Sequence, residues 1–333
     1  MIKKIIQFSF FLLIGISGFT QVPQNGQDST INNLVHAPGY KTSELGAIPQ
    51  YVKTGKGKKT LILVPGLGFD ASVFKDFMEA NKKVYTMYAI TIPGNGNTAA
   101  PPMPDSGTSY GAQTWNKGIV EGLNKLIEKE KIEKPIIVGH FAQGVQLAVR
   151  MAVDHSDKVG GLILLGGPAK FVAALGKKVT EYPLDKMIFF TDNYTGPKWF
   201  KHMKKPFFDD NNFAPEIYSL DSAIGNALWE QVAAVPAPVA MRYSSEYFAS
   251  DVRVEFNKIK CPVLVLRAKY NQKVLEEPIN SYLKPQFIDT WDIAPSLNSR
   301  IKIIDIENAA GFVWKDKPKE VYNEIKNFVT TIK

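Results

Sequence analysis

The chain has 333 residues, of which 45% are hydrophobic and 22% are charged, and its formal net charge is +8 with one cysteine, Cys261. This apolar content is that of a globular protein with one large core or two modest ones, and it excludes a disordered chain, a collagen-like rod and a disulfide scaffold. Acidic residues interleave with the basic ones, so the charge predicts solubility and a weak attraction for anions, with no nucleic-acid partner.

The N-terminus has the layout of a secretory signal peptide. Lys3 and Lys4 precede an apolar stretch over residues 5–19, which is too short for a comfortable membrane span of about 20 residues. We therefore expect a signal peptide over residues 1–20, a linker over 21–35, and export to the periplasm or the medium with no stable membrane span after cleavage. The alternative is an uncleaved anchor, because Thr20 is a poor match for the small residue preferred before the cut.

From residue 50 onward, short apolar runs alternate with amphipathic stretches, which is typical of parallel strands joined by crossover helices. The runs are almost continuously apolar and so predict strands covered on both faces; they are residues 60–64, 84–92, 135–138, 162–165, 262–266 and 301–306. Apolar stripes at helical spacing predict helices around residues 115–127, 145–152 and 321–332. The second of these carries Gln146, Arg150 and Asp154 on its polar back.

This rhythm fails between residues 168 and 256, where aromatic, proline and lysine residues cluster without clear strands. Such an insertion is too long for a plain connection, so it predicts a helical cap, with the core formed by residues 36–167 and 257–333. Lys201, Lys204 and Lys205 beside the cap aromatics indicate either an amphipathic mouth for a ligand or ordinary packing of a lid.

Two turns carry the strongest functional signal. Residues 61–70 read Leu-Ile-Leu-Val-Pro-Gly-Leu-Gly-Phe-Asp, a strand that enters a glycine-rich turn, and residues 135–144 read Pro-Ile-Ile-Val-Gly-His-Phe-Ala-Gln-Gly, a strand that enters a tight turn and a helix. With Gly94, Gly96 and the strand at 259–266, they resemble the α/β-hydrolase family, in its lid-bearing esterase and peptidase branch, over about residues 50–331. The resemblance implies a mostly parallel twisted sheet flanked by helices, with a helical cap insertion. It also implies an oxyanion-hole N–H at Leu67 and a nucleophile elbow at the second turn.

The elbow departs from the family pattern. If Gly144 is the glycine two places after the nucleophile, the nucleophile position is Ala142 and the second oxyanion N–H belongs to Gln143; we prefer this register. If Gly139 and His140 begin the motif, the position falls on Phe141. Neither a methyl group nor a phenyl ring can attack a carbonyl carbon, so the usual covalent catalysis has no reagent.

The other two triad positions are also altered. None of the four histidines, His36, His140, His155 and His202, follows the last predicted strand, where the resemblance places the general base. The expected His-Phe pair reads Gly311 and Phe312, and the acid position reads Asn271. Displaced acids are an alternative, namely Glu276, Glu277, Asp289 and Asp292. The sequence therefore predicts that Ala142, Asn271 and Gly311 replace the catalytic triad, which leaves only background catalysis.

The remaining candidates have simpler interpretations. His140 could activate a pocket water, but a histidine at a strand end is more often structural, and His155 lies at the far end of its helix. His202 in the cap faces either solvent or a ligand. Residues 209–212, Asp-Asp-Asn-Asn, lack the pattern of a calcium loop. No histidine or cysteine cluster predicts a metal, and the Gly94–Gly96 turn does not extend into a dinucleotide fingerprint, so we expect no cofactor.

The leading hypothesis is an exported, cofactor-independent α/β-hydrolase-fold protein that has lost its catalytic triad. Its lidded pocket, lined by Leu67, Gln143, His140, Phe141 and Phe312, would bind a small apolar, acyl or aromatic molecule. One alternative is an active carboxylic-ester hydrolase that uses a non-standard nucleophile, or a water activated by His140 or His202. A second alternative is a structural or interaction protein with a protein partner.

Overall fold

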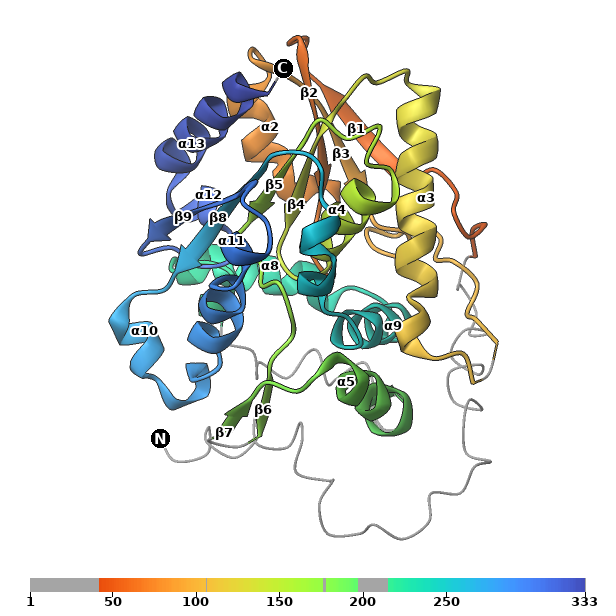
Figure 1. Ribbon diagram of the computed structural model, residues 1–333, viewed down its shortest axis with the longest axis vertical. Helices are drawn as coiled ribbons and strands as arrows, with labels where there is room; N and C mark the ends of the chain where they lie inside the picture. The colour runs from red at the N-terminus through yellow and green to blue at the C-terminus, as the bar shows by residue number, and fades with distance from the viewer. Residues whose placement is uncertain (1–41, 106, 176–177, 197–214, 333) are drawn as a thin grey trace, which may run out of the picture.

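The computed structural model describes residues 42–105, 107–175, 178–196 and 215–332. Its centre is a seven-stranded sheet in the order β1-β3-β2-β4-β5-β8-β9 (Figure 1). The strands are β1 (Gln50–Thr54), β2 (Lys59–Val64), β3 (Tyr85–Thr91), β4 (Ile136–His140), β5 (Gly161–Leu165), β8 (Val263–Lys269) and β9 (Ile301–Glu307). Strand β1 pairs antiparallel with β3, and the other neighbours pair in parallel. This arrangement confirms the predicted α/β-hydrolase fold.

Successive residues of each buried strand enter different cores, because side chains alternate across a sheet. Leu61 and Leu63 of β2 join one apolar cluster, whereas Ile62 and Val64 join the other. Helices α2 (Lys75–Asn81), α12 (Val313–Asp316) and α13 (Pro318–Thr331) cover the first face, and α3 (Thr114–Lys129) and α4 (Gln143–Asp154) cover the second (Figure 1). Because helices cover both faces of the sheet, the residues of its buried strands have to be almost continuously apolar, as the sequence predicts.

The chain between β5 and β8 supplies the cap region. Its described elements are the hairpin β6 (Ala173–Leu175) and β7 (Lys178–Thr180), then α5 (Leu184–Phe190), α8 (Ser222–Ala233) and α9 (Ala237–Phe248). After β8 follow two short helices, α10 (Gln272–Glu276) and α11 (Ala294–Leu297). Figure 1 shows the cap elements gathered at one end of the sheet.

Helix α9 covers the polar back of α4. Gln146 is fully buried, and its amide donates a hydrogen bond to the carbonyl oxygen of Tyr247 at 3.3 Å. Arg150 likewise donates to the hydroxyl of Ser250 at 3.1 Å. The polar residues on this side of α4 thus mark a contact with the cap, because a buried polar group needs a partner.

A buried carboxylate joins the cap to the core. Glu246 of α9 accepts hydrogen bonds from the backbone N–H groups of Trp115 at 3.0 Å and Asn116 at 2.9 Å, in the first turn of α3. Arg242, one helical turn away on α9, donates to the same carboxylate at 2.7 Å. Both side chains are buried. Unpaired N–H groups at a helix start favour a negative charge, so Glu246 caps α3 from another element.

We predict that Glu246→Gln lowers the free energy of unfolding by about 3–5 kcal/mol, since it leaves the buried Arg242 guanidinium without its counter-charge. Urea unfolding of the purified protein measures the change. The control is Glu128→Gln, because Glu128 forms a half-exposed ion pair with Lys158; this variant should lose less than about 1 kcal/mol. Equal losses in the two variants would contradict the capping role.

Candidate functional site

The first functional turn follows β2 and lies directly against the second. A Cβ atom built on Gly66 would lie 2.7 Å from the carbonyl oxygen of Phe141 and 2.8 Å from its Cβ atom. Only glycine permits this approach, because real side chains do not reach such distances. Leu67, the predicted oxyanion residue, is the next residue along this turn and is partly buried.

The second turn keeps the strained backbone of an elbow. Strand β4 ends at His140 and helix α4 begins at Gln143, so Phe141 and Ala142 make the whole turn. Phe141 has φ 43° and Ala142 has φ 46° with ψ −107°. Each such conformation costs a non-glycine residue on the order of 1–3 kcal/mol. The surrounding structure therefore holds this corner in place.

Glycines on both sides of the elbow let helix α4 approach the sheet. A Cβ atom on Gly144 would lie 2.6 Å from the carbonyl oxygen of Pro65, and one on Gly139 would lie 2.5 Å from the carbonyl oxygen of Gly144.

Phe141 and Ala142, the two residues of the turn, each satisfy part of the nucleophile pattern. Ala142 precedes the first residue of the helix, and Phe141 directs its side chain toward the predicted histidine position. The preferred register at Ala142 remains a prediction.

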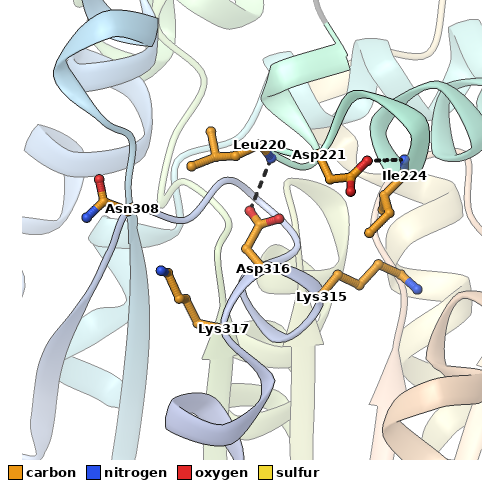
Figure 2. Close-up of a pocket in the computed structure, with 7 residues that line it drawn as sticks. All are labelled: Leu220, Asp221, Ile224, Asn308, Lys315, Asp316 and Lys317. Atoms are coloured by element: carbon orange, nitrogen blue, oxygen red, sulfur yellow. Dashed lines mark hydrogen bonds between the residues drawn. The ribbon is translucent and has the colours of Figure 1, made fainter.

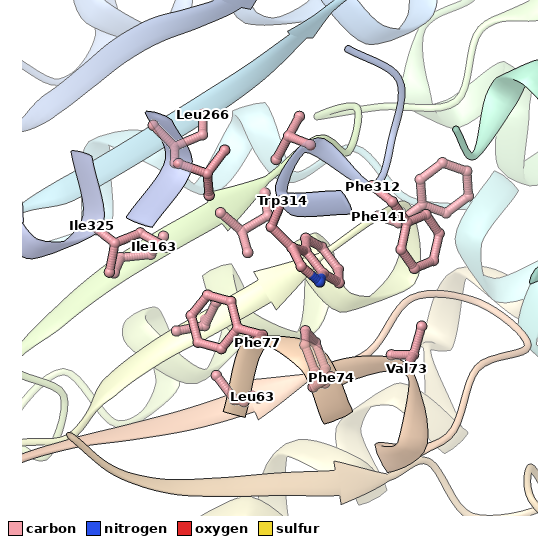
Figure 3. Packing of buried hydrophobic residues seen from close by; sticks show 14 of the residues in the cluster. Leu63, Val73, Phe74, Phe77, Phe141, Ile163, Leu266, Phe312, Trp314 and Ile325 are labelled. Atoms are coloured by element: carbon pink, nitrogen blue, oxygen red, sulfur yellow. The ribbon is translucent and has the colours of Figure 1, made fainter. Parts of the chain in front are cut away.

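The side chain of Phe141 fills the space beside Gly311. A Cβ atom built on Gly311 would lie 2.5 Å from Cε2 of Phe141, and 2.9 Å from the carbonyl oxygen of Ile217. Figure 3 shows the Phe141 ring beside Phe312, and their centroids are 6.1 Å apart. A side chain at 311 therefore cannot coexist with the present position of this ring. Phe141 of the turn and Gly311, at the predicted histidine position, are therefore coupled by packing.

His140 is enclosed by aromatic rings. The ring centroids of Phe312 and Trp314 lie 4.2 Å and 4.6 Å from that of His140, and Phe74 follows at 6.0 Å. The side chain has no exposed surface. Burial lowers the pKa of His140 well below its usual range, and the backbone of Gly311 opposes this shift only in part. Neither ring nitrogen has a well-aligned hydrogen-bond partner among the described residues.

The side chain at the predicted acid position is engaged elsewhere. The side-chain oxygen of Asn271 accepts a hydrogen bond from the backbone N–H of Val274 at 3.0 Å and so caps helix α10. The neighbouring Tyr270 is buried, and its hydroxyl donates to the carbonyl oxygen of Ile217 at 3.0 Å. Tyr270, which the sequence analysis did not single out, thus shares this acceptor with the backbone N–H of Gly311.

The displaced acids do not gather at the elbow. Glu276 and Glu277 are exposed. Asp289 pairs with Lys284 at 2.6 Å, and Asp292 pairs with Arg267 at 2.6 Å. These carboxylates therefore have other partners or face solvent.

The backbone N–H groups of Leu67 and Gln143 stay predicted oxyanion donors. Neither is a donor among the backbone hydrogen bonds of turns, loops and caps in the described residues. The side chain of Gln143 points into the cap contact instead, where its amide donates to the side-chain oxygen of Asn116 at 2.8 Å. Asn116 in turn joins the Glu246 network.

Other candidates from the sequence lie away from the elbow or outside the described residues. His155 is the C-cap of α4, at the opposite end of that helix. The signal peptide, the linker, His36, His202, the cap lysines and residues 209–212 fall outside the described residues. Across residues 42–332, gaps excepted, no three His, Cys, Asp or Glu side chains come close enough to share a metal ion.

Comparisons with known proteins identify the family of the chain. A model of the alpha/beta hydrolase family matches residues 61–323. The chain belongs to the alpha/beta hydrolase family. A 2-hydroxy-6-oxononadienedioate/2-hydroxy-6-oxononatrienedioate hydrolase from Paraburkholderia phymatum is 31% identical over 131 residues, which is 37% of this chain and 42% of that relative's length.

Solved structures of the family share its fold. A thermophilic esterase from Thermogutta terrifontis superposes with a TM-score of 0.60 at 15% identity, over 85% of this chain and 93% of the esterase. An enol-lactonase from Burkholderia xenovorans LB400 gives a TM-score of 0.58 at 14% identity, over 84% of this chain and 96% of the lactonase. Where the structure describes the chain, none of its helices is long and apolar enough to cross a bilayer.

A cavity of about 400 Å³ lies beside the family site, between the cap and α12 (Figure 2). Its lining residues are Leu220, Asp221, Ile224, Asn308, Lys315, Asp316 and Lys317. The two carboxylates have partners, because Asp221 caps α8 and Asp316 accepts from the backbone N–H of Leu220. The sequence analysis did not find this cavity, since its residues come from separate parts of the chain.

We predict that Gly311→Ala lowers the free energy of unfolding by about 1–3 kcal/mol, because the added methyl group overlaps the Phe141 ring. In a Phe141→Ala background, the same substitution should cost at least about 1 kcal/mol less, since the ring is gone and only the Ile217 carbonyl remains close. Chemical denaturation of the four proteins gives the coupling. Additive effects would show that the two positions do not compete for space.

We also predict a pH-dependent stability that depends on His140. The unfolded chain takes up a proton at the ordinary histidine pKa of 6.5, whereas the folded chain keeps His140 neutral. The free energy of unfolding should therefore fall by about 1.4 kcal/mol for each pH unit below 6.5, and this contribution is fully present above 6.5. Urea unfolding between pH 7.5 and 5.0 measures it. His140→Phe should remove this slope, and parallel profiles for both proteins would exclude a neutral buried imidazole.

Proposed function

We propose that this chain is a non-catalytic member of the alpha/beta hydrolase family that acts by binding a small molecule. The observation that carries the proposal is the packing of Phe141 against Gly311. Acyl transfer by this fold needs a nucleophile, a base and an acid that orients the base. Phe141, Ala142, Gly311 and Asn271 supply none of these groups.

The buried hydroxyl groups near Gly311 do not supply the missing chemistry. Burial raises the pKa of Tyr270 and of Tyr218 above the usual range, so both side chains stay neutral phenols. A neutral phenol is a poor nucleophile. The alternative of a water activated by His140 lacks support, because the surrounding rings leave that side chain no exposed surface.

The ligand we propose is apolar, acyl or aromatic and carries a carbonyl or carboxylate oxygen. The N–H groups of Leu67 and Gln143 are donors for such an oxygen, in the way that an oxyanion hole holds a substrate. The rings of Phe69, Phe141 and Phe312 provide an apolar surface beside them. The names of the relatives, an esterase, an enol-lactonase and a hydrolase of an oxo-dioate, support this class.

We further propose that the chain is exported and works in the periplasm or outside the cell. The support is the sequence of residues 1–20, with Lys3 and Lys4 before an apolar stretch. A protein partner remains a prediction from the sequence.

The experiment combines labelling with ligand binding. The protein should stay unlabelled by a fluorophosphonate probe and should not turn over p-nitrophenyl esters above the background rate, while a serine esterase of the same family serves as the positive control. A panel of fatty acids, aromatic carboxylates and lactones should include a ligand that raises the melting temperature. At a concentration of 100 times Kd, binding adds about 2.7 kcal/mol to the stability of the folded state.

Two results would overturn the proposal. Covalent labelling, or ester hydrolysis that survives purification to constant specific activity, would show that the chain is an enzyme. The absence of a thermal shift with every ligand of the panel would remove the binding role and favour an interaction protein.

A further inference from the structure

A segment of the cap lies across the loop that holds the predicted histidine position. The backbone N–H of Gly311 donates to the carbonyl oxygen of Ile217 at 3.1 Å, and that of Phe312 donates to the carbonyl oxygen of Tyr218 at 2.8 Å. Tyr270 adds a bond from its hydroxyl to the Ile217 oxygen at 3.0 Å. We call residues 217–221 the strap.

One carboxylate holds the strap and the loop together. Asp316 accepts a hydrogen bond from the hydroxyl of Ser219 at 2.6 Å and from the backbone N–H of Leu220 at 3.3 Å. Its second oxygen also accepts from the backbone N–H of Ala310 at 2.8 Å, on the loop itself. Hydrogen bonds to a charged acceptor are stronger than those between neutral groups. Asp316 therefore joins two segments that are far apart in the sequence.

The strap closes the apolar side of the proposed binding site. Ile217, Tyr218 and Ser219 are buried. The Tyr218 ring packs on Phe69 at 5.5 Å and on Phe141 at 5.5 Å between centroids. The Ile217 carbonyl oxygen is also one of the atoms that a side chain at 311 would meet. A ligand that reached these rings would have to displace the strap.

One end of the strap borders the pocket in Figure 2. Leu220 and Asp221 of the strap line this pocket together with Asp316. The polar bonds that would break are those of the strap to Asp316, Gly311, Phe312 and Tyr270.

We propose that the strap is an autoinhibitory closure over the binding site and that Asp316 is its latch. This inference rests on the proposed binding function. In the closed state the strap excludes an aromatic or acyl ligand, and release of the latch exposes the surface formed by Phe69, Phe141 and Phe312. Asp316 acts through the strap, so it is a positioning residue.

The test uses Asp316→Asn, which keeps the side-chain shape but removes the charge and turns one acceptor into a donor. Hydrogen exchange followed by mass spectrometry should show exchange at least about tenfold faster in peptides that contain Leu220 and in those that contain Gly311 and Phe312. Strands β4 and β5 should exchange as in the parent protein. A rise spread equally over the sheet would indicate general destabilisation and would overturn the latch.

The matched control is Asp221→Asn, in the same strap. Asp221 accepts from the backbone N–H groups of Ala223 and Ile224 only within its own helix. Asparagine caps a helix about as well as aspartate, so this variant should leave exchange nearly unchanged at the start of α8 and at Gly311 and Phe312. If it opens that loop as strongly as Asp316→Asn, the latch is not specific to Asp316.

A second readout tests closure against a ligand. Phenylacetate, an aromatic carboxylate, should associate at least several-fold faster with Asp316→Asn than with the parent protein in stopped-flow tryptophan fluorescence. An unchanged association rate together with faster exchange would overturn the gating role. A further outcome is that neither protein binds any ligand of the panel while the strap and the loop at Gly311 still exchange faster together in Asp316→Asn. That result would contradict the proposed binding function but would support the role of Asp316 in holding the strap.

Discussion

The competition of two residues for one volume determines how the turn after strand β4 packs against the loop at residue 311. The ring of Phe141 lies where a side chain on residue 311 would be, so a large residue at the elbow requires glycine on the loop. The same ring then packs against Tyr218, Phe287 and Phe312. These contacts fill the predicted site with dense hydrocarbon packing, and packing of this kind tolerates few single changes.

The turn between strand β4 and helix α4 holds a strained backbone. Phe141 and Ala142 keep positive φ angles, and this strain persists because the surrounding glycines fix the helix against the sheet. His140 also stays at the strand end although its nitrogens face aromatic rings. The two apolar cores on either side of the sheet stabilise this frame of the alpha/beta hydrolase fold.

Much of the fold follows from the sequence, because buried parallel strands and amphipathic helices have strong patterns. The strand β1 was not predicted, since Gln50–Thr54 is an edge strand with mostly exposed residues and lacks an apolar run. The assignment of Ala142, Asn271 and Gly311 to the triad positions rests on residue identities alone and stays a prediction. The contact between Phe141 and Gly311 cannot be predicted from the sequence, because the two residues are far apart in the chain and meet only in the folded structure. Asp316 stands between two lysines, a pattern typical of a solvated surface, and its role as a hydrogen-bond acceptor for the strap depends on the tertiary structure.

The capping of α3 by Glu246 has a consequence for how this architecture can change in evolution. A helix that obtains its N-terminal acceptor from a separate segment cannot keep its first turn satisfied when that segment is deleted or exchanged. Removal of the cap would leave the N–H groups of Trp115 and Asn116 without the carboxylate. An exchange of the cap for another segment would therefore have to bring a matching acceptor for the start of α3.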